Sequence, residues 1–364
     1  MSHEAVFGAE EAPSIQRCGS CAAEWPFALT ASSCPTCDGL LEVIHPQPAT
    51  HGAALLSRFG GRCCTHFGSE SSGVWRFREL VMPGDGSIVS HPEGNTPLLH
   101  RARIAEYAGV PALMLKHEGR NPTGSFKDRG MTAAVTHAVR TAATAVACAS
   151  TGNTSASLAA YAAQAGLPAL VFVPEGKIAL GKIAQALAYG ARTLIVKGDF
   201  DDCLRLARES SRELGVYLAN SINPWRVEGQ KTIVFEMLQQ LGWHAPDWIV
   251  LPAGNLGNTS AFGKALRELH ALGLITTMPR VLAVQAMGAA PFAHAFETGF
   301  TTHEPVRAAT VATAIRIGDP ASWDRAVRVI VLTGAGRAFC AGLNLEAQSK
   351  GTDNLSVGSG ATPT

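Results

Sequence analysis

From Pro97 onward, short apolar runs alternate with stretches of helical periodicity, and this alternation constrains the fold more than any other feature. Five runs have the length and apolar character of buried strands: residues 145–149, 169–173, 193–196, 248–251 and 281–285. The helical patterns that separate them cover residues 155–165, 182–189, 200–214 and 260–272. Because strands separated by helices usually pair in parallel, we expect an α/β fold whose parallel sheets are covered by helices on both faces.

Three polar loops each lie between an apolar run and a helical stretch. They are residues 121–129 (NPTGSFKDR), 150–157 (STGNTSAS) and 253–260 (AGNLGNTS). The first holds Lys127 just after a turn-like segment, where a lysine can form a Schiff base with a carbonyl cofactor. The third has closely spaced glycines before a helix, so its backbone N–H groups can hold a phosphate. A lysine and a phosphate cradle together predict pyridoxal phosphate, bound beyond the carboxyl ends of the strands.

Two cysteine pairs near the N-terminus have the spacing of a metal site. Cys18 and Cys21 form one pair, and Cys34 and Cys37 form the other. Four thiolates brought to one point suit tetrahedral zinc in a closed structural site. The pattern also allows two turns with reduced thiols, or a ribbon that has lost its metal. The stretch that follows, residues 45–73, contains Gly and Ser and resembles a linker.

Composition excludes several classes of protein. A chain of 364 residues has room for two or three domains. No apolar run approaches the roughly 18 to 20 residues that span a membrane. The first residues, MSHEAVFGAEEAP, lack the features of a signal peptide. We therefore expect a cytoplasmic protein. A net charge of +1 without a long basic stripe argues against nucleic acid as a partner. The 12 histidines show no metal spacing, and we assign them no role.

From about residue 17 to 328 the chain resembles the threonine synthase family, which are fold-type II pyridoxal phosphate enzymes. The motifs that carry the resemblance are EGNTPLL (93–99), KHEGRNPTGSFKDRG (116–130), ASTGNTSAS (149–157), NSINPWRVEGQKT (220–232), PAGNLGN (252–258) and TAIRIGDP (313–320). The resemblance implies a tryptophan synthase β-like fold with two parallel-sheet α/β domains. The expected parts are a zinc-ribbon-like segment (17–45), a larger domain (46–120 with 224–328) and a smaller domain (121–223).

The resemblance also implies roles for individual residues. Lys127 is the expected catalytic Schiff-base lysine, Phe126 packs on the cofactor, and Asn153 bonds the phenolic oxygen of its ring. The expected phosphate-binding residues are Gly254, Asn255, Leu256, Gly257, Asn258 and Thr259. The expected contacts with the substrate O-phosphohomoserine come from Ser150, Thr151, Thr154, Asn220, Ser221 and Arg226. Arginine suits this task because its planar fork donates two parallel charged hydrogen bonds to a phosphate.

The implied enzyme is a lyase that converts O-phosphohomoserine and water to threonine and phosphate. The sequence leaves open whether the protein forms a homodimer.

Taken alone, each motif has a simpler interpretation. Lys127 could be a solvated charge, Asn153 a helix cap, Arg226 a surface ion pair and the Gly-Asn loop an ordinary turn. Two alternative functions are a non-catalytic relative that binds pyridoxal phosphate, and another fold-type II lyase such as a threonine or serine dehydratase.

The end of the chain departs from this pattern. Residues 327–345 (VRVIVLTGAGRAFCAGLNL) resemble a piece of the enoyl-CoA hydratase family, and we assign residues 329–347 to this piece. The larger domain is therefore expected to be truncated at its C-terminal side. Residues 329–332 are a candidate substitute strand, and the small, polar tail, residues 348–364, is expected to be disordered.

Overall fold

The computed structural model describes residues 13–63, 65, 67–176 and 180–333. The chain divides into two compact units. The first consists of Met1–Ala245 with Ser260–Met278, and the second consists of Pro246–Thr259 with Pro279–Thr364. No helix in the described part of the chain is long and apolar enough to cross a lipid bilayer.

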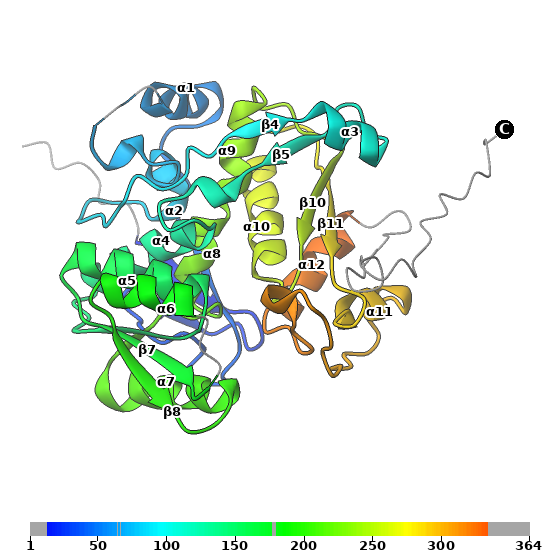
Figure 1. Ribbon diagram of the computed structural model, residues 1–364. Coiled ribbons are helices and arrows are strands. Elements are labelled where there is room, and N and C mark those ends of the chain that lie inside the picture. Colours follow the sequence, from blue (N-terminus) through cyan, green and yellow to red (C-terminus); the bar gives the residue numbers. More distant parts are fainter. Residues whose placement is uncertain (1–12, 64, 66, 177–179, 334–364) are drawn as a thin grey trace, which may run out of the picture. The chain divides into compact units, whose positions relative to one another are not determined.

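A four-stranded parallel sheet dominates the first unit (Figure 1). Its strand order is β8-β7-β6-β9, from Arg192–Val196, Ala169–Pro174, Val146–Ala149 and Tyr217–Leu218. Helices α5 (Asn153–Ala165) and α6 (Leu180–Ala188) lie on one face, and α7 (Phe200–Leu214) covers the other. Ala147, Phe172, Cys203 and Leu218 are among the apolar side chains buried between α7 and the sheet. The parallel sheet covered on both faces is therefore confirmed.

Two further helices of the first unit, α4 (Lys127–Arg140) and α8 (Pro224–Gln230), pack against each other. Glycines at their crossing let the backbones approach closely: a Cβ on Gly229 would lie 1.7 Å from the carbonyl oxygen of Arg129, and one on Gly130 would lie 2.9 Å from that of Arg226. The other helices of the unit are α1 (Gly52–Cys63), α2 (Arg78–Val81), α3 (Ala102–Ala108), α9 (Thr232–Gln240) and most of α10 (Gly257–Ala271).

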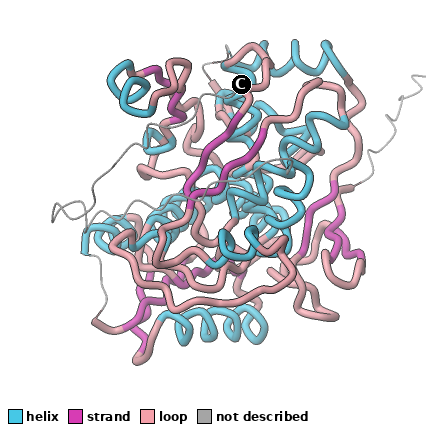
Figure 2. The backbone as a smooth tube through the Cα atoms, turned by 90° about the vertical axis from the view of Figure 1, so that its right-hand side faces the viewer, coloured by secondary structure: helices cyan, strands magenta, loops and turns pink. Residues whose placement is uncertain are grey.

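The first unit also holds two small antiparallel sheets. Strands β1 (Ile15–Cys18), β2 (Glu24–Pro26) and β3 (Leu41–Ile44) form one in the order β2-β1-β3, and β4 (Leu98–His100) pairs with β5 (Met114–Lys116) in the other. Single-turn 3₁₀ helices lie at Ser69–Ser71, Trp75–Phe77 and Glu118–Arg120. Figure 2 shows how the strands, in magenta, are interspersed among the helices, in cyan.

The second unit contains the parallel pair β10 (Trp248–Pro252) and β11 (Arg280–Val284). Its helices are α11 (Pro291–Glu297), a 3₁₀ turn at Thr313–Ile315 and α12 (Trp323–Thr333). Leu256, Phe292, Ala295, Trp323 and Ala326 are buried in its apolar core.

The structure corrects two expectations. Residues 45–73 are not a linker throughout, because helix α1 lies within them and buries Leu55 and Phe59 one turn apart. Residues 329–332 are helical and belong to α12, so they form no substitute strand. The remainder of the hydratase-like segment, residues 334–347, and the expected disordered tail, residues 348–364, lie outside the described residues.

Candidate active site

Lys127 is the first residue of α4. Its ammonium nitrogen lies 4.0 Å from the centroid of the Phe126 ring. Burial, followed by the positive charge of Arg226, lowers the pKa of Lys127 to about 7. A lysine with this pKa is neutral for a large part of the time near pH 7, and a neutral amine is both a nucleophile and a base.

The turn before Lys127 is held by a buried carboxylate. Asp128 accepts hydrogen bonds from the backbone N–H of Thr123 at 2.7 Å, from the hydroxyl of Thr123 at 2.5 Å and from the hydroxyl of Ser157 on α5 at 2.6 Å. The backbone N–H of Lys127 donates to the hydroxyl of Ser125 at 3.3 Å. These contacts tie the turn to the first residues of α4 and to α5, and so fix where the lysine side chain begins.

Arg226 on α8 is a buried cation with unused donors. The residue is 1% exposed, and its Nη1 atom donates to the carbonyl oxygen of Ala219 at 3.2 Å. Its Nε and Nη2 atoms have no partner among the described residues. Burial lowers the pKa of Arg226 to about 10, so the guanidinium is still charged at neutral pH. A buried guanidinium with two unpaired donor atoms is costly unless an anion binds to it.

The carboxyl end of β6 gathers several of the expected substrate residues. Asn220 forms two hydrogen bonds of 3.0 Å with the backbone of Ala149, one to its N–H and one to its carbonyl. The hydroxyl of Ser150 accepts from the N–H of Gly152 at 3.1 Å. Thr151 follows Ser150 in the loop, Asn153 and Thr154 are the first residues of α5, and Ser221 follows Asn220.

Asn153 is the first residue of α5, and its Oδ1 atom is buried without a partner in the described part of the chain. The helix-cap alternative for Asn153 is not what the structure shows, because Gly152 is the N-cap residue and makes no side-chain cap. The amide oxygen of Asn153 is therefore available to a ligand.

The glycine loop belongs to the second unit. It leaves β10 at Ala253, whose N–H donates to the carbonyl oxygen of Val284 at 2.7 Å, and it enters α10 at Gly257. A Cβ on Gly254 would lie 3.1 Å from Cα of Ile315, and Leu256 adopts a left-handed φ of 59°. The loop therefore wraps tightly against the TAIRIGDP motif at the start of a helix.

The polar side chains of this loop differ in their contacts with the described part of the chain. Oδ1 of Asn258 and Oγ1 of Thr259 are buried and unpaired within the described ranges. In contrast, Oδ1 of Asn255 accepts from the N–H of Ala321 at 2.6 Å, so this side chain anchors the segment that leads into α12. The sequence did not predict that anchoring role.

The four cysteines converge as the spacing predicted. The Sγ atoms of Cys18, Cys21, Cys34 and Cys37 all lie within 4.8 Å of one another. Cys18 and Cys37 are 3.5 Å apart at sulfur, and Cys21 and Cys34 are 3.7 Å apart. We refer to residues 14–45, which carry this cluster, as the cysteine ribbon.

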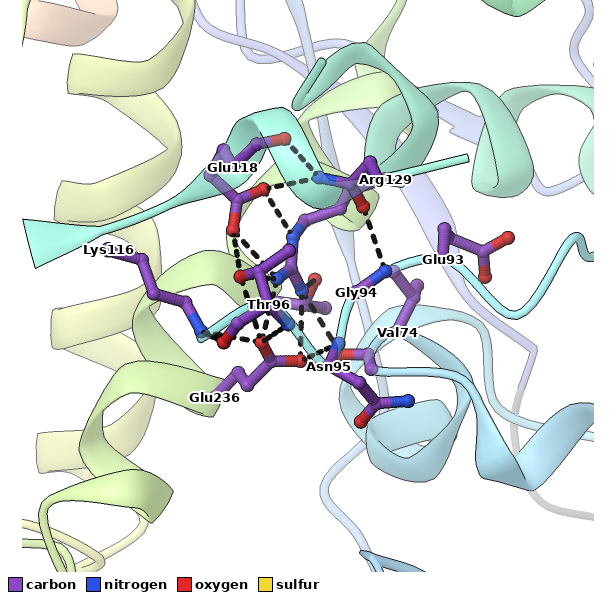
Figure 3. Close-up of polar contacts among 12 residues, drawn as sticks. Val74, Glu93, Gly94, Asn95, Thr96, Lys116, Glu118, Arg129 and Glu236 are labelled. Carbon is purple, nitrogen blue, oxygen red and sulfur yellow. Dashed lines mark hydrogen bonds and ion pairs between the residues drawn. The ribbon is translucent and has the colours of Figure 1, made fainter. Parts of the chain in front are cut away.

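A buried polar cluster near the lysine was missed by the sequence analysis (Figure 3). Glu236 on α9 accepts hydrogen bonds from Lys116 at 2.6 Å, from Arg129 at 2.9 Å and from the backbone N–H groups of Asn95 and Thr96 at 2.8 and 2.9 Å. Arg129 also pairs with Glu118 at 2.7 Å. Most of these residues lie inside the quoted motifs, but the pairing of Glu236 joins segments more than 100 residues apart, which no local pattern reveals.

The chain matches the family model described as pyridoxal-phosphate dependent enzyme over residues 89–341. It is 45% identical over 315 residues to threonine synthase of Methanosarcina acetivorans, covering 86% of this chain and 75% of the relative. It is 43% identical over 322 residues to threonine synthase of Methanocaldococcus jannaschii, covering 88% of this chain and 77% of the relative. It is 52% identical over 254 residues to threonine synthase of Mycobacterium leprae, covering 69% of this chain and 68% of the relative.

Solved structures agree on the fold. A threonine deaminase from T.th. matches with a TM-score of 0.57 at 25% identity, covering 70% of this chain and 78% of that one. Maize serine racemase matches with a TM-score of 0.55 at 24% identity, covering 64% and 69%.

The expected likeness to enoyl-CoA hydratases finds no support, since the pyridoxal-phosphate family model itself extends to residue 341. The threonine synthase resemblance, the fold-type II architecture and the coenzyme class are all confirmed. The chain belongs to the threonine synthases, within the family of pyridoxal-phosphate-dependent enzymes.

Proposed function

We propose that this chain acts on O-phosphohomoserine, converting it with water to threonine and phosphate, with Lys127 and Arg226 as the two central side chains. The single observation that carries the proposal is the buried guanidinium of Arg226 with two donor atoms unpaired among the described residues, beside a lysine of lowered pKa. A guanidinium in this state suits the phosphate of the substrate. A lysine in this state suits proton transfer.

The residues present fit pyridoxal phosphate. A lysine for covalent attachment, an aromatic ring beside it at Phe126 and the side-chain amide of Asn153, whose oxygen has no partner among the described residues, are the groups that such a coenzyme uses. The loop of Gly254, Asn255, Leu256, Gly257, Asn258 and Thr259 leads into a helix start, where backbone N–H groups favour a phosphate. When bound, the coenzyme supplies an electron sink that makes the Cα proton of an amino acid easier to remove.

The chain's own residues then divide the work. Lys127, once its amine is free, takes the proton from Cα of the substrate and helps to move one from Cβ. Arg226 holds the γ-phosphate, which orients the substrate and stabilises the charge of the departing group. Hydroxyls of Ser150, Thr151, Thr154 and Ser221, with the amide of Asn220, supply the remaining contacts with the substrate.

We further propose that Cys18, Cys21, Cys34 and Cys37 hold a structural zinc ion. The mutual approach of four sulfurs supports this assignment, because four thiolates in a closed cluster are a preferred zinc site. Metal analysis of purified protein should find about one zinc per chain. Cys34→Ser should release it, whereas Cys203→Ser, which changes a buried cysteine on α7, should not.

The enzymatic test uses purified protein with pyridoxal phosphate and O-phosphohomoserine, and measures phosphate and threonine together. Arg226→Gln should raise KM by roughly 10- to 100-fold, the equivalent of a lost charged hydrogen bond or two. Lys127→Ala should abolish turnover and the visible absorbance band of lysine-bound coenzyme. Arg205→Gln, on the exposed side of α7, is the matched control and should leave KM, turnover and the absorbance band unchanged.

Other outcomes would select the alternatives. A coenzyme band without turnover would indicate a non-catalytic binding protein. Keto-acid formation from unphosphorylated threonine or serine would indicate a dehydratase-type lyase. The three-part domain division, a homodimer and a cytoplasmic location stay predictions from the sequence.

A further inference from the structure

The cysteine ribbon makes an aromatic contact with the helix that carries Arg226. The Phe27 ring lies 5.0 Å from the Trp225 ring and 4.8 Å from the His137 ring, edge to face in both cases. His137 on α4 stacks on Trp225 at 4.4 Å, and its Nε2 atom is 2.8 Å from the carbonyl oxygen of Phe27. Trp225 is 1% exposed and directly precedes Arg226.

The ribbon makes a second, polar attachment to the same helix. Nε2 of His45 lies 2.8 Å from Oε2 of Glu228. Lys264 on α10 donates both to the carbonyl oxygen of Val43 on β3 and to Oε1 of Glu228. The two attachments, at Trp225 and at Glu228, therefore lie on either side of Arg226 along the chain.

Helix α8 has little stability of its own. It is seven residues long, which is too short to persist without tertiary packing. It is confined between α4, which Gly229 approaches through its backbone, and the ribbon. Among the described residues, the Arg226 guanidinium has one hydrogen bond, from Nη1 to the carbonyl oxygen of Ala219. The direction in which the guanidinium points therefore depends on the position of α8.

The ribbon also touches α4, at His137, but the lysine lies at the other end of that helix and is held there by other groups. Asp128 and Arg129, which directly follow it, are held by Thr123, Ser157, Glu118 and Glu236, none of which belongs to the ribbon. A disturbance of the ribbon should therefore reach Arg226 more strongly than Lys127.

We propose that the cysteine ribbon positions Arg226 through Phe27 and His45, so that an intact ribbon sets the affinity of the phosphate site. Phe27 and His45 are positioning residues in this scheme. Loss of the ribbon's metal would weaken binding of the phosphorylated substrate while the coenzyme stays attached to Lys127. The inference rests on the proposed function, since it takes Arg226 to be the phosphate partner.

The test compares Phe27→Leu, His45→Ala and Arg17→Gln in the full-length, coenzyme-loaded protein. The readouts are KM and kcat for O-phosphohomoserine, the dissociation constant of inorganic phosphate by calorimetry, and the visible coenzyme band. Phe27→Leu and His45→Ala should each raise KM and the phosphate dissociation constant about 3- to 10-fold, with the band unchanged. Arg17→Gln, which breaks an exposed ion pair on the ribbon, should change nothing. If Phe27→Leu does not fold, His45→Ala carries the test.

A double mutant separates positioning from general damage. If Phe27 acts through Arg226, then Phe27→Leu should have no further effect on phosphate affinity in an Arg226→Gln background. Removing the metal from wild-type protein with a chelator should reproduce the Phe27→Leu result.

Two results would overturn the inference and leave the proposed function standing. One is a raised KM in Arg226→Gln but an unchanged KM in Phe27→Leu and His45→Ala; the other is independent, additive effects in the double mutant. An unchanged KM in Arg226→Gln itself would instead refute the phosphate role of Arg226, and the inference with it.

Discussion

Glu236 and Arg129 form a fully buried ion pair, with 2.9 Å between Oε1 and Nη2 and with both side chains inaccessible to solvent. Burial by itself raises the pKa of Glu236. The charges of Arg129, Lys116 and Arg76 outweigh that effect and hold the pKa well below its usual range. The pair connects α9 to the first turn of α4, two residues beyond Lys127. It is therefore part of what holds the lysine in place (Figure 3).

Glu236→Gln should destabilise the protein by about 3 to 5 kcal/mol, because three buried cations would lose their shared carboxylate. Denaturant unfolding monitored by circular dichroism measures this loss. Glu209→Gln, which breaks an exposed pair with Arg205, should change stability by less than about 1 kcal/mol. Equal effects of the two substitutions would contradict a structural role for the cluster.

Gly229→Ala should be among the most damaging small substitutions in the chain. The added Cβ would lie 1.7 Å from the carbonyl oxygen of Arg129, so α4 and α8 would have to move apart. We expect a loss of more than about 3 kcal/mol, or no soluble protein. Gly60→Ala in α1 meets no atom within 4 Å and should stabilise by up to about 1 kcal/mol, since alanine favours helix. Thermal unfolding of the two variants compares them directly.

Coenzyme loading of the apoprotein should depend on pH through Lys127. The pKa of this lysine is lowered to about 7, so its reactive neutral form dominates above that pH and is lost below it. The rate at which the visible band grows should therefore rise with pH, with a midpoint near 7. Arg226→Gln removes a positive charge that lowers the pKa of Lys127, and should move the midpoint to higher pH. A wild-type midpoint near the ordinary lysine value of about 10.4 would refute this assignment.

Acid should weaken the protein through His137. Burial lowers the pKa of His137 to about 4, whereas in the unfolded chain it is about 6.5. Between these values the unfolded state binds the proton and the folded state does not, so stability is complete above about pH 6.5 and falls as the pH drops towards 4. The expected loss is about 3 kcal/mol.

Urea unfolding at about pH 7 and about pH 4.5 measures this dependence. His137→Gln should flatten the difference between the two pH values, while the exposed His244→Gln should leave it unchanged. A difference that survives in His137→Gln would assign the acid sensitivity to other groups.

Local periodicity predicted nearly all the strands of the parallel sheets, whereas two other expectations from the sequence were wrong. Strands β6, β7, β8, β10 and β11 lie where apolar runs predicted them. In α1, Gly60 and Gly61 lower the helix propensity, and burial of Leu55 and Phe59 outweighs that cost. Residues 329–332 are rich in branched side chains, yet they continue the helix whose residues Trp323, Ala326 and Val329 are buried at helical spacing.

The sequence by itself determined the parallel α/β fold, the position of Lys127 at a helix start and the four-cysteine cluster, because periodicity and short motifs are local properties of the chain. Only the tertiary structure decided that Arg226 is buried with donors unpaired among the described residues, that Glu236 pairs with Arg129, and that Phe27 packs on Trp225. These relationships join segments that are distant in the sequence. They also depend on exclusion of water, which shifts a pKa or leaves a donor unpaired only once the chain has folded.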